Sequence, residues 1–216
     1  MTDTRYWIAF NLVPQIGPAK VQRLLERFGD LQTAWQASHF DLATAGLDKR
    51  AFDNLLETRQ NIDLDAEMEK IARAGVRILT LDDPGYPRLL KNISNPPFVL
   101  YVKGEIISDD DWSVAVVGTR RASAYGRQVT RQIVTDLVRN HVTIVSGLAR
   151  GIDAEAHRAA LDAKGRTLAV LGCGIDVIYP PEHKKLAEQI IEHGALLSEY
   201  PLGTQPEAGN FPPRNR

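Results

Sequence analysis

Four short segments in the second half of the chain combine glycine with hydroxyl or charged side chains. They are Gly118-Thr119-Arg120-Arg121, Ser146-Gly147-Leu148-Ala149-Arg150-Gly151, Gly172-Cys173-Gly174 and Ser198-Glu199-Tyr200-Pro201. Because glycine has no Cβ, its backbone N–H can approach a ligand closely, and a helix that begins there adds partial positive charge. Hydroxyl groups are further donors, and the guanidinium of Arg120 suits a two-pronged contact with a phosphate. These segments predict an anion-binding site that includes Gly118, Thr119, Arg120, Ser146 and Gly147.

Small residues between a strand and a helix can also serve only to turn the chain. That interpretation is sufficient for one such loop, whereas four loops at the ends of four strands favour a phosphate site. The chain contains neither the dinucleotide-binding pattern G-x-G-x-x-G nor the nucleotide-binding pattern G-x-x-x-x-G-K-[ST]. We therefore expect phosphate binding, but no NAD, no ATP and no other cofactor.

The elements that must position these loops alternate between strand and helix. Short runs rich in β-branched and aliphatic residues predict strands at 113–117, 142–145, 167–171 and 195–197. Helical spacing predicts helices at 125–139, 154–163 and 182–193, the first with Val129, Ile133 and Leu137 on its buried face. Strands apolar on both faces that alternate with helices predict a parallel, Rossmann-like sheet. Right-handed crossovers then place all four strand C-termini at one edge, where open α/β sheets bind ligands.

The first part of the chain follows a different pattern. Apolar residues recur at helical spacing through residues 1–74, which predicts a small all-α module, and a segment rich in Pro and Gly at 75–110 connects it to a domain at 111–216. The connecting segment contains a strand-like run at 98–102. Residues Val13 to Lys20 resemble a helix-hairpin-helix, a motif whose glycine offers N–H groups to a DNA phosphate. A SAM-like interaction module with a vestigial hairpin is an equal alternative.

Composition indicates an ordinary globular protein. Of 216 residues, 44% are hydrophobic and 25% are charged, and the net charge is −1. Residues 1–110 carry 13 Lys/Arg against 16 Asp/Glu, and residues 111–216 carry 13 against 11, so any nucleic-acid site must be a local pocket of a few cations. No apolar run could span a membrane, and Cys173 is the single cysteine, which excludes an intramolecular disulfide. We expect a cytoplasmic location.

The motifs of both halves resemble the DprA/Smf family of DNA-processing proteins. The resemblance rests on the blocks Val117-Gly118-Thr119-Arg120, Ser146-Gly147-Leu148-Ala149-Arg150-Gly151-Ile152-Asp153 with Ala156-His157, Leu171-Gly172-Cys173-Gly174-Ile175-Asp176, Tyr179-Pro180, Ser198-Glu199-Tyr200-Pro201, Phe211-Pro212-Pro213-Arg214-Asn215-Arg216 and, earlier, Asn95-Pro96-Pro97 and Leu100-Tyr101-Val102-Lys103-Gly104. It implies a non-enzymatic protein that binds single-stranded DNA, protects it and transfers it to the RecA recombinase in natural transformation.

The resemblance also implies particular DNA contacts. Arg120 and Lys184 match positions where the family places a DNA-contacting arginine and lysine, and Arg214 belongs to a cationic Arg-Asn-Arg block. Some relatives place an aromatic residue three positions after that lysine, where this chain has Ala187, so base stacking at that position is not expected. We expect Arg150 to brace its loop by pairing with Asp153.

Four side chains also fit enzymatic roles. Asp153 and His157 share a helix face and could form an acid–base pair, although packing is the favoured role of the histidine. Cys173 could be a nucleophile, but no base is evident nearby, which favours a buried thiol. Glu199 could act as the base of a nucleotide hydrolase, which is the main alternative function. A protein adaptor with a vestigial pocket is a third possibility.

The strand–helix alternation also predicts that these residues are part of a longer protein. The block ending at Arg216 stops where another helix is due, and in the family it opens a helix leading to further strands that contribute to a homodimer interface. We expect the longer protein to dimerise.

Overall fold

The computed structural model describes residues 3–216 and divides into two compact units, residues 1–100 and 101–216. The boundary lies within the segment expected to connect two domains. No helix within the described residues has the length and apolar character that crossing a membrane requires.

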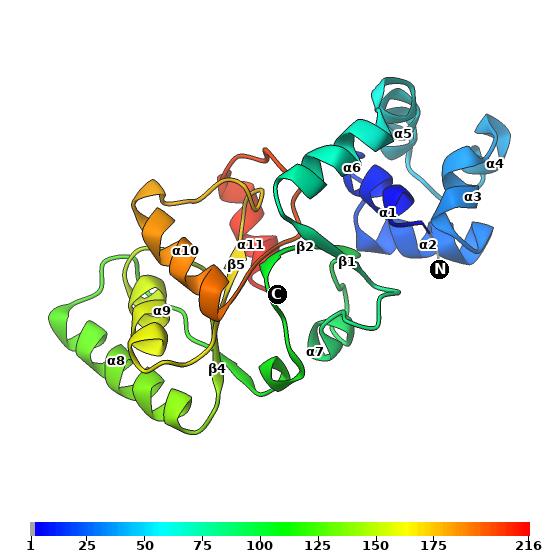
Figure 1. The fold of residues 1–216 in the computed structure, drawn as a ribbon. Helices are drawn as coiled ribbons and strands as arrows, with labels where there is room; N and C mark the ends of the chain where they lie inside the picture. The colour runs from blue at the N-terminus through cyan, green and yellow to red at the C-terminus, as the bar shows by residue number, and fades with distance from the viewer. Residues whose placement is uncertain (1–2) are drawn as a thin grey trace. The chain divides into compact units, whose positions relative to one another are not determined.

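The first unit is largely helical, as the apolar spacing predicts (Figure 1). Its elements are α1 (Thr4–Asn11), α2 (Pro18–Phe28), α3 (Leu31–Gln36), α4 (His39–Ala43), α5 (Lys49–Asn61), α6 (Leu64–Arg73), β1 (Arg77–Thr80) and α7 (Arg88–Lys91). Helices α3 to α6 each begin after a residue whose side chain accepts a hydrogen bond from a backbone N–H of the first turn: Asp30, Ser38, Asp48 and Asp63. Trp7, Phe10, Leu24 and Leu55 are fully buried and form part of its core.

The second unit is the predicted α/β domain. Its main elements are β3 (Ser113–Ala115), α8 (Ala124–Arg139), β4 (Thr143–Ser146), α9 (Ile152–Asp162), β5 (Thr167–Leu171), α10 (Lys184–His193), β6 (Gly194–Ser198) and α11 (Phe211–Arg214). Strand β2 (Val99–Gly104) begins just before the boundary. The strand order is β1-β2-β6-β5-β4-β3.

Strands β3, β4, β5 and β6 are parallel neighbours, which confirms the Rossmann-like prediction. Register pairs include Val114 with Ile144 and Thr167 with Gly194, whereas β2 runs antiparallel to β6. Helices α8, α9 and α10 pack side by side against one face of the strands, and α11 lies beyond β5 on the other (Figure 1). The carboxyl ends of the four parallel strands therefore share one edge of the sheet.

The buried face of α8 differs from the sequence prediction. Thr130, Val134 and Val138 face the core, and Ile133 is 52% exposed. The predicted set, which includes Ile133, and the observed set, which includes Val134, both repeat every fourth residue and both contain apolar side chains. Spacing alone therefore could not show which set faces the core. Packing decides, because the alanines of α9 at 156, 159 and 160 allow a close approach that Val134 and Val138 fill.

Candidate nucleic-acid interface

The loops that leave β3 and β4 are joined by a carboxylate. Asp153, in the first turn of α9, accepts hydrogen bonds from the N–H of Gly118 (3.4 Å) and from the N–H of Gly147 (3.2 Å). These are two of the backbone donors expected to bind an anion. The buried carboxylate of Asp153 therefore binds two N–H groups that the sequence predicts to bind a phosphate.

The hydroxyl groups of the same loops also have partners within the protein. Ser146 Oγ donates to the carbonyl of Val116 (2.6 Å), and Thr119 Oγ1 accepts from the N–H of Arg121 (3.1 Å). The Ser146 hydroxyl has only one hydrogen to donate, so it would have to release the Val116 carbonyl to bind a ligand as a donor. The Thr119 hydroxyl still has its hydrogen available.

Two glycines in these loops allow close approach by other parts of the protein. A Cβ on Gly151 would collide with the carbonyl oxygen of Thr119 and lie 2.9 Å from Arg120 Cα, and Gly151 also has a φ of +78°. A Cβ on Gly147 would lie 2.7 Å from Cζ of Arg214. Glycine is therefore required at position 151 by the neighbouring backbone, whereas a Cβ at position 147 would have to displace the Arg214 guanidinium.

Arg120 is an exposed cation at this edge. Its guanidinium carbon lies 5.6 Å from the centre of the Phe211 ring, a cation–π contact that orients the side chain. Within residues 3–216 no carboxylate forms an ion pair with it, so its charge is available to a ligand. Placement on a ring limits the rotamers of a long side chain and lowers the entropy lost when it binds.

Arg214 approaches the same ring but faces inward. Its guanidinium carbon lies 5.7 Å from the Phe211 centre, and it donates to the carbonyl oxygens of Gly147 (3.2 Å) and Val170. Burial lowers the pKa of Arg214 from its ordinary value, while the negative charge of Asp153 acts in the opposite direction. Arg214 also lines a cavity of about 270 Å³, whose other lining residues are Ala115, Val117, Val145, Ser146, Gly147, Val170 and Asn215.

Lys184 is the first residue of α10, and its side chain is exposed. None of the residues in the described range 3–216 pairs with it. Ala187 is 1% exposed and packs in the core, so no side chain at that position of this fold could present a surface to solvent without repacking.

Arg150 does not pair with Asp153 as expected. Its Nε donates to Glu182 Oε1 at 2.5 Å, and this hydrogen bond raises the pKa of Arg150 and lowers that of Glu182. Both side chains are largely exposed, so the pair contributes little stability. Next to it the buried His183 ring contacts the carbonyl of Leu148 through Nδ1 at 2.8 Å. The loop after β4 is thus braced from the 3₁₀ turn Pro181–His183, a contact that no local sequence signal indicated.

The side chains considered for catalysis are held in their neutral forms or bound to other groups of the protein. Burial lowers the pKa of His157 to about 3, and burial raises the pKa of the Cys173 thiol to about 11, so at neutral pH the imidazole is neutral and the thiol is not ionised. Burial also raises the pKa of Glu199, whose carboxylate accepts from Arg216. The described residues 3–216 include no group of three histidine, cysteine or acidic side chains placed to hold a metal ion.

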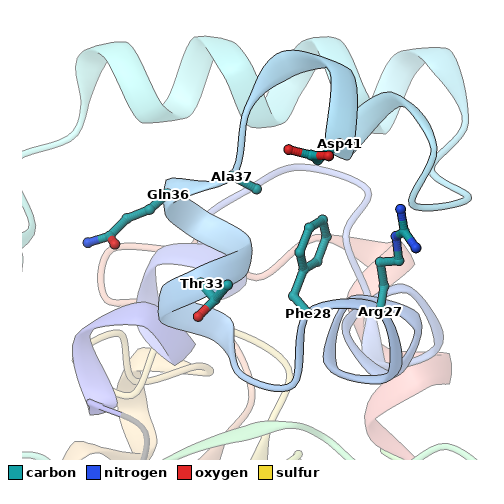
Figure 2. Close-up of a pocket in the computed structure, with 6 residues that line it drawn as sticks. All are labelled: Arg27, Phe28, Thr33, Gln36, Ala37 and Asp41. Atoms are coloured by element: carbon teal, nitrogen blue, oxygen red, sulfur yellow. The ribbon is translucent and has the colours of Figure 1, made fainter.

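The helical unit contains a second, shallower cavity of about 440 Å³. Figure 2 shows the Phe28 ring between Arg27 and Thr33, with Asp41 above it. The carboxylate of Asp41 opposes binding of a phosphate to Arg27 in this cavity, because the two anions repel each other. In the hairpin of this unit Lys20 pairs with Asp48 at 2.5 Å and donates to the carbonyl of Gln15, so its charge is already compensated.

The sheet and its strand-end loops define a Rossmann-like α/β protein, a class whose members bind ligands at the C-terminal ends of the strands. The model of the family described as DNA recombination-mediator protein A matches residues 77–216, and the chain belongs to this family.

Relatives and solved structures agree with this assignment. The whole chain is 42% identical to Protein Smf of Synechocystis sp., over 55% of that protein. It is 41% identical to DNA processing protein DprA of Bacillus subtilis, over 66% of this chain and 48% of that protein. The chain thus spans about half the length of these curated relatives.

Two solved structures are similar in fold. DNA processing protein A of Streptococcus pneumoniae matches the whole chain and 74% of its own with a TM-score of 0.80 and 32% identity. The Helicobacter pylori protein, described in terms of its single-stranded DNA binding mode, matches 64% of this chain and 63% of its own with a TM-score of 0.57 and 34% identity.

Proposed function

We propose that this protein binds single-stranded DNA along the edge formed by the carboxyl ends of β3 to β6, as a non-enzymatic DNA-processing protein of the cytoplasm. The observation that carries the proposal is Arg120, an exposed cation without a carboxylate partner among residues 3–216, held on the Phe211 ring at that edge. The description of the Helicobacter pylori relative supports the same ligand.

Some of the proposed DNA contacts are directly available, whereas others require a hydrogen bond within the protein to break first. Arg120 binds phosphate directly, with the Thr119 hydroxyl beside it and Lys184 as a second exposed cation. Arg214 reaches DNA only by releasing the carbonyls of Gly147 and Val170. Gly118 and Gly147 shape the loops, and their N–H groups bind DNA only if Asp153 withdraws.

A salt series of oligothymidylate binding tests the proposal. If about three phosphates are neutralised, log K against log salt should fall with a slope near −2, at roughly −0.7 per phosphate. Affinity should also increase with oligonucleotide length, because each added phosphate extends the contact. A flat salt response, or equal affinity for a mononucleotide and a long strand, contradicts the proposal.

The same preparation tests the alternative of a nucleotide hydrolase. We expect nucleotides and nucleoside monophosphates to remain intact, because Glu199 is bound to Arg216 and the Cys173 thiol is protonated. Hydrolysis that is abolished by Glu199→Gln supports the enzyme instead.

Two finer statements extend the proposal to the longer protein. We propose that it forms a homodimer, and that it protects the bound strand and transfers it to the RecA recombinase during natural transformation. Sedimentation of the longer protein and strand-exchange assays with RecA test these statements separately from DNA binding.

A further inference from the structure

Tyr179 is an exposed aromatic residue beside the side chain proposed to hold the DNA backbone. The residue is 40% exposed, and its ring centre lies 6.2 Å from the Phe211 ring centre, at an interplanar angle of 40°. Arg120 and Tyr179 therefore have Phe211 as a common neighbour. None of the contacts assigned so far uses the exposed surface of Tyr179.

Single-stranded DNA sites that lack sequence preference need two kinds of surface. Cations follow the phosphates, and aromatic rings stack the bases, whose π-faces are similar in all four nucleotides. The edge described above supplies the first kind through Arg120. The position on α10 that could supply the second carries Ala187, which is 1% exposed.

Of the two rings in this contact, Tyr179 is better placed than Phe211 to receive a base. The Phe211 ring is packed on Gly172, because a Cβ at that glycine would lie 2.8 Å from Cδ1 of the ring. Arg120 and Arg214 both lie within 6 Å of its centre. Phe211 therefore supports its neighbours, while Tyr179 keeps an open surface.

We propose that Tyr179 stacks a nucleobase of the strand whose phosphate Arg120 binds. The inference rests on the proposed function and names the side chain that contacts the base. The guanidinium carbon of Arg120 and the ring centre of Tyr179 are less than about 12 Å apart, since each lies about 6 Å from the same ring centre. A stacked strand advances about 3.4 Å per nucleotide, so fewer than about four nucleotides span that distance.

Pairs of ligands and variants test the inference. Tyr179→Ala and Tyr179→Phe are compared on oligothymidylate and on an abasic oligonucleotide of equal length, which keeps the phosphates and lacks the bases. Tyr179→Ala should lose about 5- to 100-fold affinity for oligothymidylate and less than about 2-fold for the abasic strand. Tyr179→Phe should retain affinity for both, because the ring is kept.

The salt slope and a control variant separate stacking from other causes. Tyr179→Ala should keep the slope of the unchanged protein, since no phosphate contact is lost. Trp112→Ala is the matched control, because Trp112 is 68% exposed but precedes β3, at the opposite edge of the sheet. Trp112→Ala should change neither the affinity for oligothymidylate nor the affinity for the abasic strand.

The outcomes distinguish failure of this inference from failure of the proposed function. The stacking role is overturned if Tyr179→Ala loses affinity equally for both oligonucleotides, or loses none for either, while the unchanged protein still binds DNA in a salt-dependent way. If the unchanged protein itself shows no salt-dependent binding, the proposed function fails, and Tyr179 has no base to stack.

Discussion

Arg120 and Arg214 contact the same aromatic ring but have different environments. Arg120 is exposed and without a carboxylate partner in the described chain, whereas Arg214 is bonded to two backbone carbonyls and partly buried. A guanidinium bound to the carbonyls of Gly147, just after β4, and Val170, in β5, stabilises this edge of the sheet, because buried carbonyls need hydrogen-bond partners. The exposed arginine keeps its donors for a ligand.

Arg120→Ala should weaken binding to all DNA sequences by a similar factor and make the salt slope shallower by about 0.7, because one phosphate contact is lost. The free energy of unfolding should change little, since the side chain is exposed. Fluorescence anisotropy in a salt series, with thermal unfolding alongside, measures both quantities.

Arg139→Ala is the control for this variant. Arg139 is 72% exposed at the last turn of α8, which ends at the opposite edge of the sheet. An unchanged slope for Arg120→Ala, or a slope equally reduced in Arg139→Ala, would show that Arg120 is not the phosphate contact.

At the scale of elements, the loops at the strand ends form one connected structure. Asp153 of α9 joins the loops after β3 and β4, and the N–H of Ile152 donates to the carbonyl of Thr119 at 3.2 Å. Gly151 allows this approach. The position of Arg120 therefore depends on the start of α9.

Gly151→Ala should displace the Arg120 loop and weaken DNA binding. The new Cβ would meet the Thr119 carbonyl, and a φ of +78° already costs a non-glycine residue on the order of 1 kcal/mol. Gly29→Ala isolates the cost of the φ angle, because Gly29, at the end of α2, has a φ of +84° with nothing within 4 Å of its Cβ. We expect both variants to lose some stability and Gly151→Ala alone to lose affinity, measured by urea unfolding and DNA titration. If Gly151→Ala binds DNA as tightly as the unchanged protein, the loop after β4 does not control the position of the Arg120 loop.

At the scale of the whole molecule, a buried histidine links stability to pH. The Thr167 hydroxyl donates to the carbonyl of Ile144, so His157 Nδ1 carries a hydrogen and donates to Thr167 Oγ1 at 2.7 Å. Its Nε2 is buried and without a hydrogen-bond partner among the described residues. Protonating this nitrogen would bury an uncompensated charge, which is why the pKa of His157 is lowered to about 3.

The free energy of unfolding should fall as pH falls from about 6.5 towards 3, because in this window the unfolded chain binds a proton at His157 that the folded protein does not. The loss from this residue is at most about 1.4 kcal/mol per pH unit. His157→Asn keeps an N–H donor and removes the titration, so its stability should depend less steeply on pH. Urea unfolding at several pH values measures the difference, with the exposed His141→Asn as control; parallel curves for the wild-type protein and His157→Asn would contradict this account.

Much of the fold follows from local patterns. The β-rich run at 167–171 is β5 residue for residue, and the other three predicted strands differ from β3, β4 and β6 by one or two residues at their ends. Short apolar strands between glycine-rich turns and helical spacing leave few alternatives to a parallel sheet. The handedness of crossovers then places Arg120 and the loop beginning at Ser146 at one edge.

Only the tertiary structure decided what those loops contact. Sequence patterns showed that glycine N–H groups occur at the strand ends, but not that Asp153 binds two of them, that Arg150 pairs with Glu182 or that Phe211 supports Arg120 and Tyr179. Periodicity reports which residues of one element share a face. The partner of a polar or aromatic side chain lies on another element, often more than 30 residues away, and its identity depends on how the packed helices orient their side chains over the sheet.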